Sequence, residues 1–336
     1  MTRQRLAVLA TVAAVAVVLA AVALIAGVRG GEQVRKPASG PRLDRVLPAA
    51  QVRSGPNIVF RSTVHGPTYG QLGIVALDDP AGPRALLPLK CLRVYATRAA
   101  GVCLTDRGNV TGYRVLLLDA ALSPRRELPL PGNPSRARLS PDSALAATTS
   151  FVEGHSYAQG GFSTETILED LRSGRSLVNL ETFAVFISGR RYRAVDLNVW
   201  GVTFVDGNRF YATVGSGAQT WLAEGNVAHR RLTALRAGVE CPSLSPDRTR
   251  IAYKWRTGND PRTWRLHVLN LRTGRDVALA ETRSVDDQAE WLDDNRVLYA
   301  LPRKTGDETD VWAVPADGSG RPQVFVPRAW SPAVVR

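Results

Sequence analysis

Short runs of apolar residues follow one another closely from residue 57 to the C-terminus. Most are rich in Val, Leu, Ile, Thr and aromatic residues, and Gly, Pro, Asp and Asn stand between them. Such runs are typical of β-strands joined by tight turns. No stretch of this region keeps a helical period for long. The pattern therefore predicts an all-β sandwich, barrel or propeller.

One turn motif occurs twice in the same frame. Residues 139–142 and 244–247 both read Leu-Ser-Pro-Asp, and a β-type run follows each copy. Proline cannot donate a ladder hydrogen bond, so it ends strand pairing, and the aspartate can accept bonds from the backbone ahead of it. A recurring strand, turn and strand unit indicates a repeat architecture.

The runs fall into six groups, each built on a unit of four. The first group, which begins at residue 57, has only three runs, and residues 329–335 remain after the sixth group. We therefore predict a six-bladed β-propeller in which the C-terminal strand completes the first blade. Such closure removes exposed sheet edges. Seven blades stay an alternative because the lengths of the groups vary.

Two segments exceed what a blade needs. Residues 154–163 form a glycine-rich loop, and residues 182–197 predict an extra hairpin around Ser188-Gly189. Exposed Tyr and Arg are frequent anchors of protein interfaces. We nominate six residues on these segments as candidate partner contacts: His155, Tyr157, Arg190, Arg191, Tyr192 and Arg193. The alternative for the hairpin is that it packs on a neighbouring blade.

The N-terminus carries an apolar segment. Residues 6–28 are apolar or small apart from Thr11, which is enough to span a bilayer as a helix. We interpret residues 1–28 as an uncleaved signal anchor, with a cleaved signal peptide as the alternative. Residues 29–56 are rich in Pro and Gly and predict a flexible tether, so the propeller occupies residues 57–336.

The sidedness of the anchor rests on two opposing arguments. More positive charge follows the apolar segment than precedes it, and a literal positive-inside count would keep the large domain in the cytoplasm. Long domains, however, cross the membrane largely regardless of charge. We therefore expect a single-pass protein of the cytoplasmic membrane with its propeller on the extracytoplasmic side.

The net charge is +13, from 43 basic and 30 acidic residues. Almost all the basic residues are arginines, and they are spread along the chain rather than gathered in a stripe. Nucleic-acid binding would require such a stripe or a known motif. We interpret the arginines mainly as a solvated surface and expect no nucleic-acid partner.

The sequence offers little chemistry for catalysis. It has no Gly-x-Ser-x-Gly motif, and Asp286, Asp287 and Glu290 form the one acidic cluster that we considered as a cation site. We interpret that cluster as a turn leading into a strand or as charges at the rim. The four histidines are isolated in the sequence: His65, His155, His229 and His267. We expect no enzyme activity, no metal and no cofactor.

Cys91 and Cys103 lie on successive β-type runs. An antiparallel pair that turns around Thr97 would place them opposite each other, so they are a candidate disulfide. The alternative is two buried free thiols. A disulfide would fit an oxidising compartment. Cys241 has no evident partner, and we expect it to be a small core residue.

Several segments together resemble TolB-type β-propellers, over roughly residues 57–336. They are the two Leu-Ser-Pro-Asp turns, Ile251-Ala-Tyr253, and residues 310–318, which read Asp-Val-Trp-Ala-Val-Pro-Ala-Asp-Gly. More narrowly, the chain is similar to membrane-anchored TolB-like proteins of actinobacteria, a match that rests on residues 154–157, 162–164, 200–204, 240–247 and 284–288. The family usually has Gly after Ser-Pro-Asp. Ser143 and Arg248 take that place here, so we expect turns that need no left-handed residue.

The resemblance implies a six-bladed propeller outside the cytoplasmic membrane that binds other proteins and is not a known enzyme. Our leading hypothesis is a scaffold whose partners are envelope or secreted proteins. The alternative is a propeller that binds or processes a small ligand or glycan at the mouth of its channel. Convergent carboxylates and histidines in the channel would favour the alternative, and an arginine-lined or apolar mouth would favour the scaffold.

Overall fold

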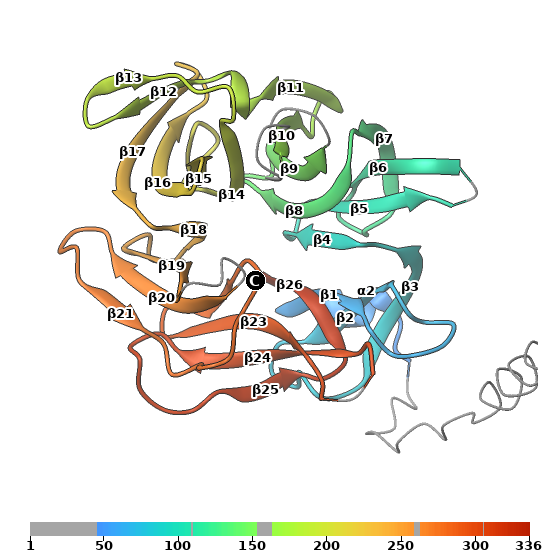
Figure 1. Ribbon diagram of the computed structural model, residues 1–336. Coiled ribbons are helices and arrows are strands. Elements are labelled where there is room, and N and C mark those ends of the chain that lie inside the picture. Colours follow the sequence, from blue (N-terminus) through green and yellow to red (C-terminus); the bar gives the residue numbers. More distant parts are fainter. Residues whose placement is uncertain (1–45, 109, 153–162, 259–262, 305) are drawn as a thin grey trace, which may run out of the picture. The chain divides into compact units, whose positions relative to one another are not determined.

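The strands of the computed structural model form six sheets arranged in a ring (Figure 1). We call the region that their innermost strands enclose the channel. The structure describes residues 46–108, 110–152, 163–258, 263–304 and 306–336. Each innermost strand contacts the innermost strand of the next blade, and the circle closes where the last blade meets the first. The prediction of an all-β, six-bladed propeller is confirmed.

The blades are numbered in chain order, and their strands run outward from the channel. Blade one contains β26 (Ala329–Val335), β1 (Asn57–Ser62), β2 (Gln71–Ala76) and β3 (Arg84–Lys90). Blade two contains β4 (Arg93–Ala96), β5 (Gly101–Arg107), β6 (Val110–Leu118) and β7 (Pro124–Leu130). Blade three contains β8 (Asn133–Leu139), β9 (Leu145–Val152), β10 (Ser163–Asp170) and β11 (Arg175–Asn179). Blade five contains β18 (Glu240–Leu244), β19 (Arg250–Arg256), β20 (Trp264–Asn270) and β21 (Asp276–Ala278), and blade six contains β22 (Glu290–Asp293), β23 (Arg296–Pro302), β24 (Thr309–Pro315) and β25 (Gln323–Val326).

Blade four has six strands. A short 3-10 helix, η1 (Leu180–Thr182), leads from blade three into it. Its regular strands are β14 (Asn198–Phe204), β15 (Arg209–Ser216), β16 (Gln219–Asn226) and β17 (Arg231–Ala237), and beyond them lie β12 (Ala184–Ile187) and β13 (Arg190–Tyr192). The extra hairpin predicted around Ser188-Gly189 is therefore present. It extends the sheet of its own blade.

The C-terminal strand closes the ring as predicted. β26 pairs antiparallel with β1, from Asn57 opposite Val335 to Ser62 opposite Ala329. The Ser331 hydroxyl ties this strand to blade two, because it donates to the Val94 carbonyl at 3.0 Å. The first blade is thus built from both ends of the propeller sequence.

The core lies between neighbouring blades. On β1, Ile58 and Phe60 pack with residues of blade six, whereas Val59 packs with residues of blades one and two. Alternate side chains of a strand point to opposite faces, and both faces are covered here. This explains why the strands are nearly continuous apolar runs.

The Leu-Ser-Pro-Asp turns adopt a conformation that differs from our expectation. Ser143 has φ of 54° and Arg248 has φ of 57°, so both positions are left-handed although neither is glycine. Hydrogen bonds inside the turn support this conformation. In the first copy, the Ser140 hydroxyl accepts the N–H of Leu145 at 2.9 Å, and the Ser143 N–H donates to the Ser140 carbonyl at 2.8 Å. These bonds stabilise a conformation that costs a non-glycine residue free energy.

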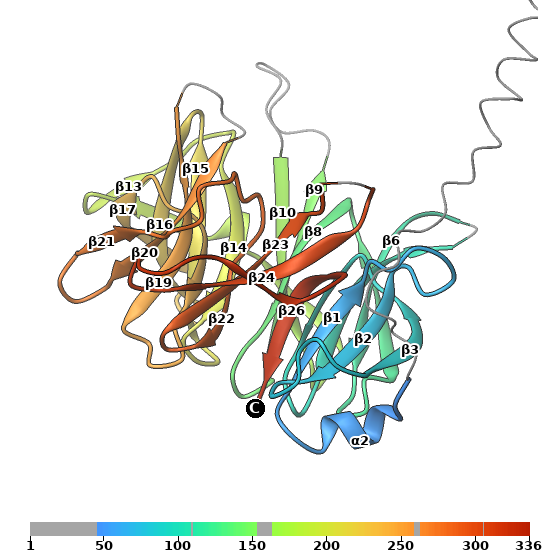
Figure 2. The ribbon, with the colours of Figure 1, turned by 90° about the horizontal axis from the view of Figure 1, so that it is seen from below.

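Part of the region that we assigned to the tether packs on the propeller. Helix α2 (Ala49–Arg53) lies at one end of blade one (Figure 2), and its Val52 is buried in a cluster that includes Ile74. Val46 forms a bridge with Arg84. Residues 29–45 and the apolar segment 6–28 lie outside the described residues. In the part of the chain that is described, no helix is long and apolar enough to cross a bilayer.

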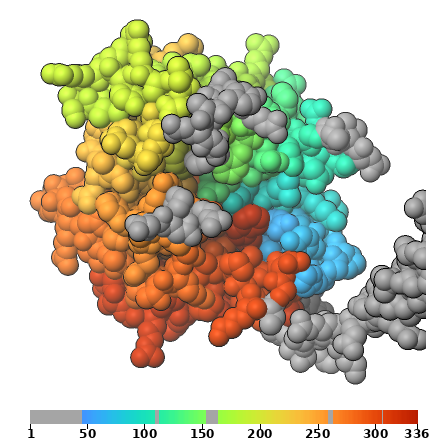
Figure 3. All heavy atoms as spheres, viewed as in Figure 1, coloured from blue at the N-terminus to red at the C-terminus, as the bar shows by residue number. Residues whose placement is uncertain are grey.

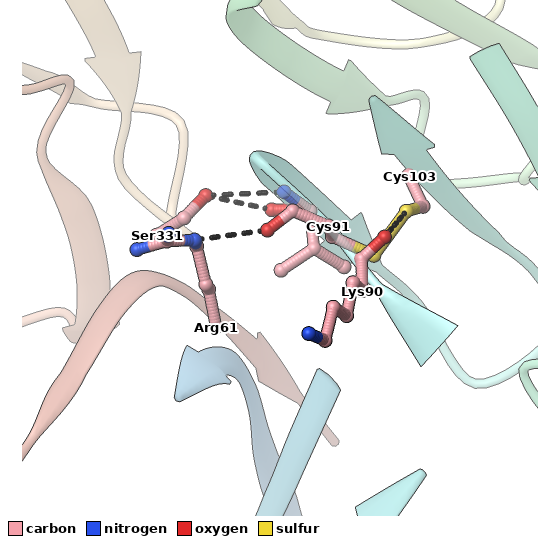
Figure 4. Close-up of a disulfide and its surroundings, with 6 residues drawn as sticks. Arg61, Lys90, Cys91, Cys103 and Ser331 are labelled. Carbon is pink, nitrogen blue, oxygen red and sulfur yellow. Dashed lines mark hydrogen bonds between the residues drawn. A yellow bond between two sulfur atoms is a disulfide. The ribbon is translucent and has the colours of Figure 1, made fainter. Parts of the chain in front are cut away.

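The predicted disulfide between Cys91 and Cys103 is present, with Cα atoms 5.4 Å apart (Figure 4). The register that suggested it is wrong. Cys103 lies opposite Val94, because the turn is closed by the Thr97 N–H donating to the Ala100 carbonyl at 2.9 Å. The true centre of the hairpin is therefore displaced from Thr97.

Cys91 precedes β4 and lies at the corner between blades one and two. Its N–H donates to the Gly70 carbonyl at 2.9 Å, and its carbonyl accepts Nε of Arg61 at 2.9 Å. The disulfide thus joins this corner to β5, which carries Cys103. The bond links two neighbouring blades through a short loop.

Replacing Cys103 with Ala is expected to lower the free energy of unfolding by about 3 kcal/mol, because the bond closes a short loop in the unfolded chain. Urea unfolding of the two proteins checks this value. Cys241→Ala is the control: Cys241 is buried and free, so that variant should still lose stability when reductant is added. Equal wild-type midpoints with and without reductant would contradict the prediction.

Candidate functional site: the arginine-lined channel

Four cationic side chains are buried around the channel: Arg93, Arg136, Arg138 and Lys254. They come from three blades, on β4, β8 and β19. Arg136 and Arg138 are two positions apart on β8, so the period of a strand turns both to the same side. Our interpretation of the arginines as mainly solvated surface is wrong for these residues.

Arg138 and Glu290 form the central ion pair. The guanidinium Nη1 of Arg138 contacts Oε2 of Glu290, and its Nη2 donates to the Ala289 carbonyl at 2.6 Å. The Arg138 guanidinium carbon also lies 4.6 Å from the centre of the Tyr95 ring, and the Tyr95 hydroxyl donates to Glu290 at 3.3 Å. Both charged side chains are more than nine-tenths buried, with 7% and 8% of their surface exposed. The pair therefore joins blades two, three and six across the channel.

Burial governs the titration of this pair. It raises the pKa of Glu290, although Arg138 and the N–H of Val334 act in the opposite direction. Burial alone would lower the pKa of Arg138, but Glu290 and Tyr95 hold it above its usual value. Burial and the charge of Glu290 also raise the pKa of Tyr95. Glu290 thus keeps Arg138 charged, whereas Arg138 limits but does not cancel the rise that burial causes in the pKa of Glu290.

A second pair joins Arg93 and Asp287, with Nη1 and Oδ1 2.8 Å apart. The Arg93 guanidinium carbon lies 4.0 Å from the centre of the Trp330 ring. Burial lowers the pKa of Arg93 to about 10, against the opposing charge of Asp287. Because Trp330 belongs to β26, this contact connects the closing strand to the channel charges.

A third pair joins Lys254 and Asp286, with Nζ and Oδ1 2.7 Å apart. Arg136 lies 3.7 Å from the same carboxylate. Burial acts to raise the pKa of Asp286, but Lys254 and Arg136 bring it below its usual value. The acidic cluster that we interpreted as a turn or rim charge therefore supplies the counterions of the channel.

The mouth of the channel beside the Leu-Ser-Pro-Asp turns is hollowed. A cavity of about 290 Å³ opens there, and Arg138, Arg248 and Arg336 line it together with Glu290. The C-terminus therefore ends at this mouth, as Figure 1 shows. None of the histidines in the described ranges lines the cavity. The mouth is therefore lined by three arginines, with Glu290 as the acid among them.

Two of the described histidines, His65 and His267, contact neighbouring side chains. His267 Nδ1 lies 2.8 Å from Oδ1 of Asp276, and the His65 ring stacks on Tyr69 with centroids 6.2 Å apart. In the ranges that the structure describes, no group of three or more His, Cys, Asp or Glu is arranged to hold a metal ion. Our prediction that the chain has no metal or cofactor stays a prediction.

The candidate partner contacts divide into three sets. Arg190, Arg191 and Arg193 are exposed on the β12–β13 hairpin. Tyr192 turns inward instead: its hydroxyl donates to Ser216 at 2.9 Å, and its ring lies 5.9 Å from that of Trp221. It anchors the hairpin. The third set, His155 and Tyr157, lies outside the described residues.

Comparison with known proteins supports the fold. No protein-family model matches the sequence, and no curated protein matches it significantly. Among solved structures, TolB from Acinetobacter baumannii superposes with a TM-score of 0.58 at 16% identity, over 85% of this chain and 68% of that one. The fold is therefore that of a TolB-like propeller. At this identity the likeness is one of fold.

Two further structures superpose less closely. A protein assigned as TolB from Agrobacterium tumefaciens gives a TM-score of 0.46 at 11% identity, over 80% of this chain and 87% of that one. A puromycin-hydrolyzing peptidase from Mycobacterium tuberculosis gives 0.47 at 15% identity, over 81% of this chain and 43% of that one. The TolB-like propeller thus spans less than half of the peptidase chain, and scores at this level carry no argument about activity.

Proposed function

We propose that this TolB-like propeller is tethered to the cytoplasmic membrane through residues 6–28, faces the extracytoplasmic side, and acts as a protein-interaction scaffold of the envelope without catalysis of its own. One observation carries the proposal. Each acid of the channel (Asp286, Asp287 and Glu290) is paired with a buried cation. Acids whose charge is engaged by a neighbouring cation are poorly placed to act as general acids or bases, which supports a role without catalysis.

The disulfide supports the location. Such bonds persist in oxidising compartments and are rare in the cytosol. The Cys91–Cys103 bond is formed in the fold, and Cys103 is fully buried. A propeller outside the membrane would keep this bond, which fits the proposed topology.

The sidedness can be tested with the full-length chain in spheroplasts of its host. Protease added outside should digest the propeller while a cytoplasmic marker stays intact. Alkylation before lysis, followed by mass spectrometry, should find Cys91 and Cys103 joined. Protection from the protease until lysis, with both thiols alkylated, would place the propeller in the cytoplasm and refute the topology.

The scaffold role can be tested by photo-crosslinking in living cells. A benzophenone amino acid is placed at exposed positions of successive blades, such as Arg175 on blade three and Arg275 on blade five. Crosslinks to defined envelope or secreted proteins at some positions are the expected result. A chain that gives no crosslinked protein at any position would contradict a scaffold.

The cavity at the channel mouth supports a second candidate function, the binding of a small anionic ligand or glycan. Arg138, Arg248 and Arg336 line the cavity and outnumber its one acid, Glu290. Glucuronate is a suitable probe because it combines a sugar ring with a carboxylate. Calorimetric binding that Arg248→Ala weakens would favour this function, and the absence of binding would exclude this ligand class.

A further inference from the structure

In the described ranges, blade four alone carries strands beyond the regular four, and they lie at its outer edge. β12 pairs in parallel with β17, from Ala184 opposite Arg231 to Phe186 opposite Thr233, and β13 then pairs antiparallel with β12. Within the described ranges, β13 has no strand on its outer side. Figure 3 shows this yellow-green hairpin standing out at the margin of the molecule. Blade four therefore ends in an open sheet edge.

The turn of the hairpin determines which backbone groups face outward. Ser188 has φ of 50° and Gly189 has φ of 77°, as in the two-residue turns that suit a β-hairpin. The flanking pair, Ile187 with Arg190, is then the hydrogen-bonded pair. The pattern alternates, so the N–H and C=O of Arg191 point away from β12. They are available to a further strand.

The edge is strongly basic. In the part of the chain that the structure describes, the guanidinium groups of Arg190, Arg191 and Arg193 have no acidic partner and no hydrogen bond. The nearby Asp196 is engaged elsewhere: its carboxylate accepts the Ser216 hydroxyl at 2.7 Å and the Gly217 N–H at 2.6 Å. The charges of the three arginines are therefore not neutralised within the blade.

Further basic side chains continue inward from this edge. Phe186 and Arg191 are directly opposite on neighbouring strands and share a face. The Arg231 guanidinium carbon lies 3.9 Å from the centre of the Phe186 ring. Beyond it, a hollow of about 210 Å³ is lined by Arg209, Arg231, His229 and Glu224, and Arg209 pairs with Asp206 at 3.1 Å. An added strand would thus meet basic groups along the edge and on the adjoining face.

We propose that the β13 edge binds an extended acidic segment of a partner protein by adding it as a further strand of blade four. This inference rests on the proposed scaffold function and names the class of partner. The backbone of Arg191 supplies the ladder bonds, and the three guanidinium groups receive the carboxylates. Arginine suits this role because its planar fork matches a carboxylate in two-point contact.

The charge also decides against self-association. A second copy of the same edge would place arginines opposite arginines, and like charges that face each other across a ladder are destabilising. Edge charges of this kind prevent unwanted pairing in many sheets. An acidic strand reverses the sign of the interaction, so the same arginines that exclude a second copy select this partner.

The test uses the full-length protein and a short fluorescent peptide that alternates Glu with Thr. A matched peptide carries Lys in place of each Glu. By fluorescence anisotropy, we expect the acidic peptide to bind with an affinity that falls as salt is added, and the Lys peptide not to bind. Failure of the acidic peptide to bind would overturn the proposal.

A second experiment tests the role of charge with a variant in which all three arginines are replaced by glutamate. Arg190→Glu/Arg191→Glu/Arg193→Glu should weaken peptide binding by about tenfold or more, from three exposed charge pairs. A control variant reverses three exposed arginines on the outer hairpins of blades five and six, Arg272, Arg275 and Arg321. It changes the net charge equally and should bind within about twofold of wild type. Equal losses in the two variants would mean attraction to the whole protein and would overturn the site.

The backbone arm tests strand addition itself. Arg191→Pro removes the outward N–H without removing a bond to β12, and Arg191→Ala removes the same charge but keeps the N–H. We expect Arg191→Pro to bind more weakly than Arg191→Ala, and the Arg191 amide of wild type to exchange more slowly with the peptide bound. Both variants should have melting temperatures close to that of the wild-type protein. Equal peptide binding by Arg191→Pro and Arg191→Ala would refute strand addition. The proposed scaffold function would still hold in that case if the photo-crosslinking experiment finds partners at other blades.

Discussion

Deletion of residues 329–336 is expected to abolish the single cooperative unfolding transition of the propeller. The deletion removes β26, which pairs with β1 along its length and buries Ala329, Ala333 and Val335. It also removes Trp330, on which Arg93 stacks. The lost ladder, the lost burial and the open edge of β1 together should cost more than about 5 kcal/mol, which is a large share of the stability of a domain.

The experiment compares the thermal unfolding of the truncated and full-length proteins by circular dichroism, with size-exclusion chromatography to detect aggregation through the exposed edge. Deletion of Arg336 alone is the control, because that residue is exposed and lies beyond the strand. The control should melt within a few degrees of wild type. A truncated protein that also melts cooperatively at nearly the wild-type temperature would show that the ring does not depend on β26.

Arg138→Met is expected to lower the free energy of unfolding by about 3–5 kcal/mol, since it leaves Glu290 buried without its cation. Adding Glu290→Gln should recover much of this loss, because the remaining donors then face a neutral group. Urea unfolding of both single variants and the double variant gives the coupling energy. Arg296→Met is the control: its partner Asp293 is a surface residue, so the loss should stay below about 1 kcal/mol.

The same variant should show a defined dependence on pH. Glu290 has a pKa raised above its ordinary value of 4.5 in the folded protein, so the folded state binds this proton more tightly than the unfolded state does. The contribution of such a group to the free energy of unfolding is present at low pH. It is lost as the pH rises through the pKa that the group has in the folded protein. Without Arg138 that pKa rises further. The loss caused by Arg138→Met should therefore be larger at pH 8 than at pH 5, and a loss independent of pH would contradict this account.

The sequence was sufficient to predict the blades because their signals are local. The two Leu-Ser-Pro-Asp turns, and the β-type run at residues 329–335 that follows the sixth group, can each be recognised from a few neighbouring residues. The disulfide was predicted for the wrong register, since Cys91 lies just outside the ladder that was used to align it. The left-handed Ser143 and Arg248 were not predicted, because non-glycine residues reach that conformation only when hydrogen bonds around them support it.

The channel charges could not be predicted from the sequence. Arg136 and Arg138 read as ordinary exposed arginines on one strand, and Asp287 and Glu290 as a turn some 150 positions away. Only the meeting of the six innermost strands brings these groups together. The one available signal was the alternation of arginines directly before residues 139–142, where the inward side of an innermost strand would be expected to be apolar.

The position of β26 has a consequence for biosynthesis. Its partner β1 leaves the ribosome early, but β26 follows the sixth blade in the sequence, so the first blade stays incomplete until all the other blades have been made. Throughout that interval the inner side of β1 is an unpaired template for misassembly. A chaperone that masks this strand would be most needed during synthesis, and a fusion partner attached at the C-terminus would begin at the channel mouth, beside the strand that must dock last.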